Sequence, residues 1–331
     1  MGAIALSPTN IVNNQLTYDK DNTYISIYKY EESPEIMIKE GDVIFVKTGS
    51  TVGKVAYVDR LICKTTLNPQ VVVLKDIKCD NYILSVIMST RKFQNKIRRI
   101  TVGGAVPTLS QVAMGNLFIS LPTAKEQEKI SKFISLLDER IATQNKIIDK
   151  LQSLIKGIAQ KIVRSNKPNV RLYECVECSS STQQESEVCE QGAYPVYGAN
   201  GIVGYLDDYN TEGEAVYIIK DGSGVGTVSY VTGKCSATGT LNTLQAKDGY
   251  SLQYLYYLLK VFNFEPYKTG MAIPHIYFKD YGKAKVFCPS YTEQLQYARL
   301  LSAIDSKLSV EKNTLRNLSL QKQYLLRQMF I

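Results

Sequence analysis

The chain repeats itself at a constant spacing of 167 residues, and this repeat constrains the fold more than any single motif does. The landmarks of the first half are Ala105-Val106-Pro107, Leu121-Pro122, Glu126-Gln127 and Leu137-Asp138, and those of the second are Ala272-Ile273-Pro274, Cys288-Pro289, Glu293-Gln294 and Ile304-Asp305. With small insertions, residues 49–53 match 222–226, and Thr66-Leu67-Asn68 matches Thr240-Leu241-Asn242. A period this long indicates two copies of one domain and not a solenoid, whose repeats run about 20 to 50 residues.

The repeat sets the predicted domain boundaries within the 331 residues. We expect a first globular domain over residues 1–125, a long helix over 126–165, a second globular domain over 166–290 and a second long helix over 291–331. The first domain starts late relative to the second, which begins with Val170-Arg171-Leu172, so we expect the first to be truncated. No segment has the pattern of a signal peptide or of a membrane span, which predicts a cytoplasmic protein.

Both predicted helices carry a heptad pattern. Apolar residues recur at positions seven apart on two seams, over about five heptads, which favours two rods that pack against each other as an antiparallel coiled coil. Gln144 and Glu311 occupy the same heptad position and would meet in one layer if the rods are antiparallel; alternatively each reaches solvent or another subunit. The predicted packing residues are Ile134, Leu137, Ile141, Gln144, Ile148, Leu151, Leu301, Ile304, Leu308, Glu311, Leu315 and Leu318.

Each globular segment reads as a mixture of strands and helices, so the fold class is mixed α/β (α+β). In the first domain we predict strands over 42–46, 55–58 and 71–74 and one helix over 81–100. In the second we predict strands over 215–219 and 228–231 and a helix near 252–262.

The sequence shows no catalytic centre. Residues 49–55 resemble a P-loop, but three residues stand between the glycines where four belong, and Val55 takes the place of the magnesium-binding hydroxyl. A turn between two strands explains this stretch and its counterpart at 222–226 together. Cys175 and Cys178 have the spacing of a zinc knuckle, with Cys189 and Cys235 as further ligands in principle, but small buried thiols are the preferred interpretation, so we expect no metal site.

A basic cluster lies within the predicted helix of the first domain. Five cations and no acid occur in residues 91–99, which favours a phosphate-binding face, with a plain solvated helix face as the equal alternative. In the second domain lysines stand among tyrosines, a combination that suits phosphate contacts. His275 is either a DNA contact or an ordinary loop residue. The formal net charge of +8 agrees with a polyanionic partner without requiring one.

In the order of these features, the chain resembles the specificity subunit of type I restriction-modification enzymes. The segments that carry the resemblance are residues 41–50 (GDVIFVKTGS), 121–130 (LPTAKEQEKI) and 288–294 (CPSYTEQ). It implies that each globular unit is a target recognition domain, that the helices set the spacing between two DNA half-sites and dock two modification subunits, and that restriction subunits join indirectly. S-adenosylmethionine, ATP and magnesium would then belong to the partner subunits, and this chain would need no cofactor and perform no chemistry.

With that resemblance, the candidate DNA-binding residues are Lys47, Ser50, Thr51, Lys54, Arg91, Lys92, Lys96, Arg98 and Arg99 in the first domain, and Lys220, Ser223, Lys234, Lys268 and His275 in the second. Two alternatives of other classes remain. The chain could be an enzyme with a pseudo-dimeric active site, or a nonenzymatic coiled-coil scaffold that is indifferent to DNA.

Overall fold

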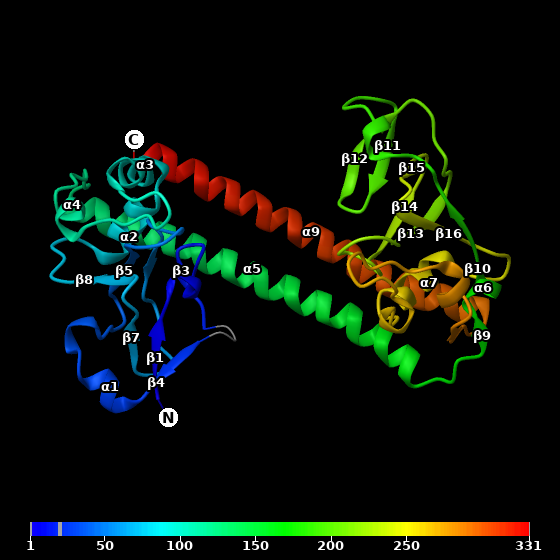
Figure 1. The fold of residues 1–331 in the computed structure, drawn as a ribbon, viewed down its shortest axis with the longest axis horizontal. Helices are drawn as coiled ribbons and strands as arrows, with labels where there is room; N and C mark the ends of the chain where they lie inside the picture. Colours follow the sequence, from blue (N-terminus) through cyan, green and yellow to red (C-terminus); the bar gives the residue numbers. More distant parts are fainter. Residues whose placement is uncertain (1, 19–21, 331) are drawn as a thin grey trace. The chain divides into compact units, whose positions relative to one another are not determined.

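The structure, a computed structural model, describes residues 2–18 and 22–330 and divides the chain into two compact units (Figure 1). The first unit comprises Met1–Thr143 and Leu315–Ile331, and the second comprises Gln144–Thr314. Two long helices, α5 (Ala124–Arg164) and α9 (Tyr291–Met329), are each divided between the two units. At about 1.5 Å per residue, they measure roughly 60 Å each. No helix in the described part of the chain is both long and apolar enough to cross a membrane.

The first unit contains two three-stranded sheets. One has the order β6-β5-β8, formed by β5 (Val43–Val46), β6 (Val55–Tyr57) and β8 (Val71–Leu74), and the other has the order β4-β1-β7, formed by β1 (Ala3–Leu6), β4 (Thr23–Ile25) and β7 (Thr65–Leu67). β5 is buried along its whole length because alternate side chains enter different clusters: Ile44 and Val46 join one core, and Val43 and Phe45 join the other. The remaining elements are β2 (Ile11–Val12), β3 (Gln15–Leu16), α1 (Ile27–Glu31), α2 (Asn81–Ser89), α3 (Arg91–Ile100), α4 (Gln111–Gly115) and 3₁₀ turns at Pro8–Asn10 and Pro34–Ile36.

The second unit repeats this plan with added strands. Its larger sheet has the order β10-β16-β13-β14, formed by β10 (Val176–Ser180), β13 (Glu214–Ile219), β14 (Val228–Thr232) and β16 (Leu241–Ala246). The smaller sheets are β12-β11-β15, formed by β11 (Tyr194–Gly198), β12 (Gly201–Leu206) and β15 (Ser236–Ala237), and the pair β9 (Val170–Arg171) and β17 (Lys285–Val286). The helices are α6 (Leu172–Cys175), α7 (Leu252–Leu259) and α8 (Phe278–Tyr281), with 3₁₀ turns at Glu185–Glu187 and Glu265–Tyr267.

The strand registers correct one part of the sequence repeat. Val71 pairs with Val46 of β5, and Leu241 pairs with Ile219 of β13, so the register makes Val71 the counterpart of Leu241. The sequence repeat instead matches Leu67 with Leu241. In the structure the counterpart of Thr66-Leu67 is the strand Ser236–Ala237, because β7 pairs in parallel with the central strand β1 of its sheet, as β15 does with the central strand β11. The sequence match failed here because the Thr-Leu pair stands on non-equivalent strands: it ends β7 in the first unit and lies at the start of β16 in the second.

The predicted helix over residues 81–100 is two helices, which is a second correction. α2 ends at Ser89 and α3 begins at Arg91, with Thr90 in an extended conformation (ψ 149°) between them. The Thr90 hydroxyl accepts a hydrogen bond from the backbone N–H of Phe93 and so caps the new helix. In the second domain α7 ends at Leu259, three residues before the predicted end.

Inside the second unit the two long helices run in opposite directions. Gln144 of α5 meets Glu311 of α9, whereas Ala159 and Ile162, later in α5, line a small cavity together with Leu301, earlier in α9. The Gln144 amide nitrogen donates to the Glu311 backbone carbonyl at 3.1 Å and to its carboxylate, so the predicted polar layer is present. The pKa of Glu311 is lowered by a hydrogen bond from Lys307 and, next, by the one from Gln144.

The predicted packing residues of α5 and α9 are all buried or half-buried. Ile134 and Ile148 in α5, and Leu301, Leu308 and Leu318 in α9, are the most completely buried of them. Leu137, Ile141, Leu151, Ile304 and Leu315 are half-buried.

The Glu-Gln pair at the start of each long helix joins that helix to its globular domain. Gln294 is 2% exposed; its side-chain oxygen accepts from the backbone N–H of Ser251 at 2.9 Å, and its nitrogen donates to the carbonyl of Pro289 at 2.9 Å. Gln127 makes the same two bonds, to Asp80 and Pro122. The repeated Glu-Gln pair therefore marks a joint between domain and helix.

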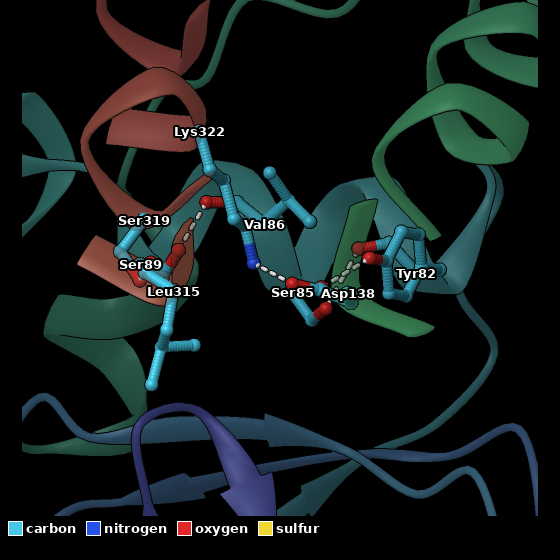
Figure 2. A network of polar contacts seen from close by, with 8 residues as sticks. All are labelled: Tyr82, Ser85, Val86, Ser89, Asp138, Leu315, Ser319 and Lys322. Carbon is cyan, nitrogen blue, oxygen red and sulfur yellow. Dashed lines mark hydrogen bonds and ion pairs between the residues drawn. The ribbon is translucent and has the colours of Figure 1, made fainter. Parts of the chain in front are cut away.

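A further polar network holds the globular part of the first unit to both helix segments (Figure 2). The Tyr82 hydroxyl on α2 donates to Asp138 on α5 at 2.7 Å, and Lys322 on α9 forms an ion pair with the same carboxylate. Burial, followed by the hydrogen bond to Asp138, raises the pKa of Tyr82. In the second unit Tyr257 donates to Asp305 at 3.3 Å, and Asp305 is the repeat counterpart of Asp138.

Candidate nucleic-acid interface

The glycine-rich stretch of the first unit is a turn between β5 and β6, as the sequence predicted. Gly49 and Gly53 have positive φ angles of 105° and 99°, which glycine adopts without steric cost. The N–H of Gly53 donates to Val46 at 3.0 Å, and that of Gly49 donates to Pro107 at 2.9 Å. An anion-binding loop needs free N–H groups directed at its ligand, and in this turn these two amides are already bonded within the protein.

The second unit builds the same turn from different residues. Gly222 and Gly226 have φ angles of 95° and 89°, and their N–H groups donate to Pro274 and Ile219, each at 2.9 Å. In both units the bond to a proline carbonyl ties the glycine turn to a second loop, residues 102–109 or 269–276. Each unit therefore presents a cluster of two adjoining loops.

The second loop of each cluster is narrow and closed by its own backbone. Val102 and Thr108 exchange hydrogen bonds at 3.0 and 2.8 Å, and Thr269 and His275 exchange two at 2.9 Å. Aliphatic side chains stand at the tips, where Val106 is 60% and Ile273 is 66% exposed. A loop that is closed by its own backbone and has an exposed apolar tip is suited to contact a base edge or the methyl group of thymine.

α3 supplies the positive charge next to the loops of the first unit. Phe93 and Ile97 bury one face of the helix, and the Gln94 amide donates to the carbonyl of Gly53 at 2.8 Å, which fixes the helix against the glycine turn. Arg98 and Arg99 are exposed in the last turn, four and three residues before the second loop begins at Val102. Within the described residues, no cation of this helix forms an ion pair with a carboxylate, so their charge is available to phosphates.

The other predicted residues of the first unit are divided between the loops and neighbouring surfaces. Ser50 and Thr51 lie at the tip of the glycine turn, and half-buried Lys47 lies just before it. Lys54 reaches the carbonyl of Ile11 at 3.1 Å. Exposed Arg91 begins α3, whereas Lys92 and Lys96 line a cavity of about 370 Å³ together with residues 119–122. Lys96 donates there to the carbonyl of Phe118 at 2.7 Å.

In the second unit the structure brings three of the five predicted residues directly into the loop cluster. Lys220 precedes the glycine turn, Ser223 lies within it, and His275 closes the second loop. Lys268 lies next to this loop and pairs with Glu265 at 2.6 Å. Lys234 does not join them, because it follows the far end of β14, a strand about 17 Å long at 3.4 Å per residue. There Lys234 contacts Glu212 and the ring of Tyr209.

The two units carry different chemistry beside the same loops. The place of the basic helix α3 is taken in the second unit by the turn Glu265–Tyr267 and its aromatic neighbours. Phe262 packs against Phe264 and Tyr267, with ring centroids 4.8 and 5.9 Å apart. The His275 ring lies edge-on to Tyr277 at 5.0 Å.

The cysteines do not form a metal-ligand set. Over residues 2–18 and 22–330, no group of three or more His, Cys, Asp or Glu side chains is placed to hold a metal ion. Cys175 lies beside Cys288, with sulfur atoms 3.8 Å apart, and both thiols are buried. The spacing of Cys175 and Cys178 therefore reflects their position around the start of β10.

Comparison with known proteins identifies the family of this chain. The family model for the type I restriction modification DNA specificity domain matches the chain twice, over residues 6–153 and 169–319. The chain belongs to this family. Each match contains one globular domain and most of the long helix that follows it, so in this chain the repeated unit is the domain together with its helix.

The relatives of this specificity protein are distant. It is 27% identical to the type I restriction enzyme EcoprrI specificity subunit of Escherichia coli, over 35% of this chain and 29% of that protein. It is 24% identical to a putative type I specificity subunit of Mycoplasma genitalium, over 72% of this chain and 68% of that protein. The alignment with the E. coli protein thus spans less than a third of its length.

The fold is also found among solved structures. The structure of an S subunit from M. genitalium has a TM-score of 0.68 with this chain, at 18% identity, and the match covers 100% of this chain and 92% of that one. A structure from work on complex assembly and conformational transition of the type I R-M system has a TM-score of 0.55 at 15% identity, over 100% and 91% of the two chains.

Sequence reasoning did not select the apolar loop tips of the two specificity domains. Val106 and Ile273 belong to the repeated Ala-Val-Pro and Ala-Ile-Pro segments, and the fully exposed Met271 directly precedes the second of them. The sequence signal for these tips is an aliphatic residue followed by proline in a glycine-containing loop. In such a loop, burial in the core does not account for the presence of an aliphatic side chain.

Proposed function

We propose that this chain is the DNA-recognition subunit of a type I restriction-modification complex, in which each globular domain reads one half of a bipartite DNA site. The observation that carries the proposal is the repeated loop cluster: one scaffold presents two different sets of side chains. Arginines, hydroxyl groups and an aliphatic tip stand beside the loops in the first unit, and lysines, aromatic rings and a histidine stand there in the second. A common frame with different surfaces is what two different half-sites require.

Phosphate contacts and base contacts fall to different residues in this proposal. Arg98 and Arg99 in the first unit and Lys220 and Lys268 in the second would bind phosphates and set the register on DNA. Ser50, Ser223 and His275, with the aliphatic tips, would contact base edges. The long helices would set the length of the unspecified spacer between the half-sites, since each is continuous over about 60 Å.

The catalytic chemistry would belong to the partner subunits of the complex. We propose that two modification subunits dock on the helices, that they bind S-adenosylmethionine and methylate DNA, and that restriction subunits, which join indirectly, use ATP and magnesium. This assignment also implies a cytoplasmic location.

Binding of DNA duplexes by the chain, alone and together with modification subunits, tests this function. We expect salt-dependent binding by the isolated chain and preference for a bipartite site once modification subunits are added. A chain that ignores DNA under both conditions would support the scaffold alternative. Methyltransferase or ATPase activity in the isolated chain would support the enzyme alternative.

A further inference from the structure

Two buried thiols lie side by side in the second unit. The sulfur atoms of Cys175, at the end of α6, and of Cys288, between β17 and α9, are 3.8 Å apart, although 113 positions separate the two residues in the sequence. Cys175 is 0% and Cys288 is 6% exposed. A disulfide needs a separation of about 2.05 Å, so a closure of roughly 1.8 Å would join the two sulfur atoms.

The backbone around both thiols is held by hydrogen bonds. The side-chain oxygen of Asn169 accepts from the backbone N–H of Cys288 at 2.8 Å, and its nitrogen donates to the carbonyl of Cys288 at 2.7 Å. The N–H of Leu172 donates to the carbonyl of Ala284 at 3.0 Å, which fixes α6 against the chain that leads to Cys288. The fold therefore keeps Cys175 and Cys288 within reach of each other.

The surroundings of the pair favour the reactive, ionised form of a thiol. The hydrogen bond from Cys288 has the largest effect and lowers the pKa of Cys175; the Tyr250 hydroxyl and the charge of Lys247 lower it further, against burial and the charge of Glu174. The thiolate is the form that reacts with oxidants. Tyr250 is half-buried and Cys288 keeps a small exposed edge, so the route to the pair admits a small oxidant.

The pair belongs to the second unit alone. At the repeat spacing of 167 residues, Leu121 holds the place of Cys288 in the first unit. Cys288 also directly precedes Pro289, whose carbonyl accepts the hydrogen bond from Gln294 at the start of α9. A covalent bond between Cys175 and Cys288 would therefore tie the first segment of the second domain to the joint between that domain and its helix.

We propose that Cys175 and Cys288 form a site of reversible oxidation, at which a peroxide converts the two thiols into a disulfide that restrains the second unit. One sulfur attacks a peroxide oxygen, the O–O bond breaks, and a sulfenic acid and one water form. The other sulfur attacks the sulfenic sulfur, the S–O bond breaks, and a second water leaves. The two thiols lose two electrons and two protons, and hydrogen peroxide is reduced to two waters. The inference does not rest on the proposed function.

The disulfide would join the two ends of the second domain, with residues 176–287 in the closed loop. A cross-link over a long loop restricts the unfolded chain strongly, and a native disulfide typically makes global opening about 30- to 1,000-fold rarer. Reduction by a dithiol breaks the S–S bond by exchange and returns both thiols, so the restraint is reversible.

Peptide mapping of the full chain tests the site. The chain is reduced, treated with a small excess of hydrogen peroxide, alkylated at its remaining thiols and digested without reductant. We expect mass spectrometry to find a pair of peptides that joins Cys175 to Cys288, lighter by two hydrogen atoms than the two reduced peptides and separated by dithiothreitol. Cys189 is exposed and serves as the control, so Cys189→Ser should leave the yield within about twofold. Recovery of Cys175 and Cys288 as alkylated thiols, or of Cys288 joined mainly to another cysteine, would overturn the proposal.

Hydrogen exchange shows whether the cross-link restrains the second unit. In the oxidised chain, amides of β13 and β16 should exchange at least about thirtyfold more slowly, and those of β5 and β8 in the first unit should change by less than about twofold. Cys288→Ala treated with peroxide should show no slowing, which separates the cross-link from oxidation elsewhere. Equal slowing in both units, or a cross-linked chain in which β13 and β16 exchange as before, would contradict the proposed restraint.

Discussion

Replacing Gln294 by leucine should selectively destabilise the second unit. The side chain is almost fully buried and satisfies two backbone groups, the N–H of Ser251 and the carbonyl of Pro289, each at 2.9 Å. Leaving a buried polar group unsatisfied costs about 1–3 kcal/mol, and two such groups cost about 2–6 kcal/mol. Leucine returns about 1 kcal/mol or more through added apolar burial. We therefore expect the free energy of opening of the second unit to fall by about 1–5 kcal/mol.

Native-state hydrogen exchange followed by mass spectrometry measures this effect locally. Amides of β13 and β16 report on the second unit, and amides of β5 and β8 report on the first, so one experiment contains both readings. Gln296→Leu is the matched control, because Gln296 is exposed on the same helix and its replacement should change stability by no more than about 0.5 kcal/mol. A change below about 0.5 kcal/mol for Gln294→Leu, or an equal change in both units, would refute the proposed joint.

Three further predictions concern the loops and the helix pair. Arg98→Ala combined with Arg99→Ala should lower the slope of log binding constant against log salt by about 1–2, measured by fluorescence anisotropy on duplex DNA; an unchanged slope would remove α3 from the interface. Val106→Ser and Ile273→Ser should leave unfolding within about 0.5 kcal/mol of the parent, because both side chains are exposed, but should reduce discrimination between specific and unrelated duplexes. The lowered pKa of Glu311 means that its contribution to stability is complete above the unfolded value near 4.5 and is lost as the pH falls through the lower folded value. Urea unfolding at a series of pH values should show this loss in the parent and not in Glu311→Gln.

Residues with a strict period or spacing allowed the best predictions. The heptads gave the two long helices, because an apolar side chain every three or four residues can only be buried by a helix along a partner. The layer of Gln144 and Glu311 followed from the shared heptad position, and the glycine turns followed from their matching places in the repeat. The polar joint at Gln127 and Gln294 was visible as a repeated pair, but its hydrogen-bond partners were not.

Other features depend on tertiary contacts that no local pattern records. Thr90 divides one predicted helix into two because its hydroxyl caps the second, and threonine is also common inside helices. The Thr-Leu pairs at residues 66–67 and 240–241 are alike in sequence but stand on non-equivalent strands, which only hydrogen-bond register can distinguish. Lys234 was grouped with the loop lysines by composition, although a strand separates it from them. Composition gives the charge of a surface and not the position of each charge.

Mapping of methylated DNA tests the central claim most directly. Modification subunits would be expressed in a host with this chain, without it, and with the Val106→Ser variant, and methylated positions would be read genome-wide. The account predicts a chain-dependent motif of two specified halves separated by an unspecified spacer of fixed length, and loss of discrimination in one half only for the variant. Methylation that does not depend on the chain, or a single continuous motif, would contradict it.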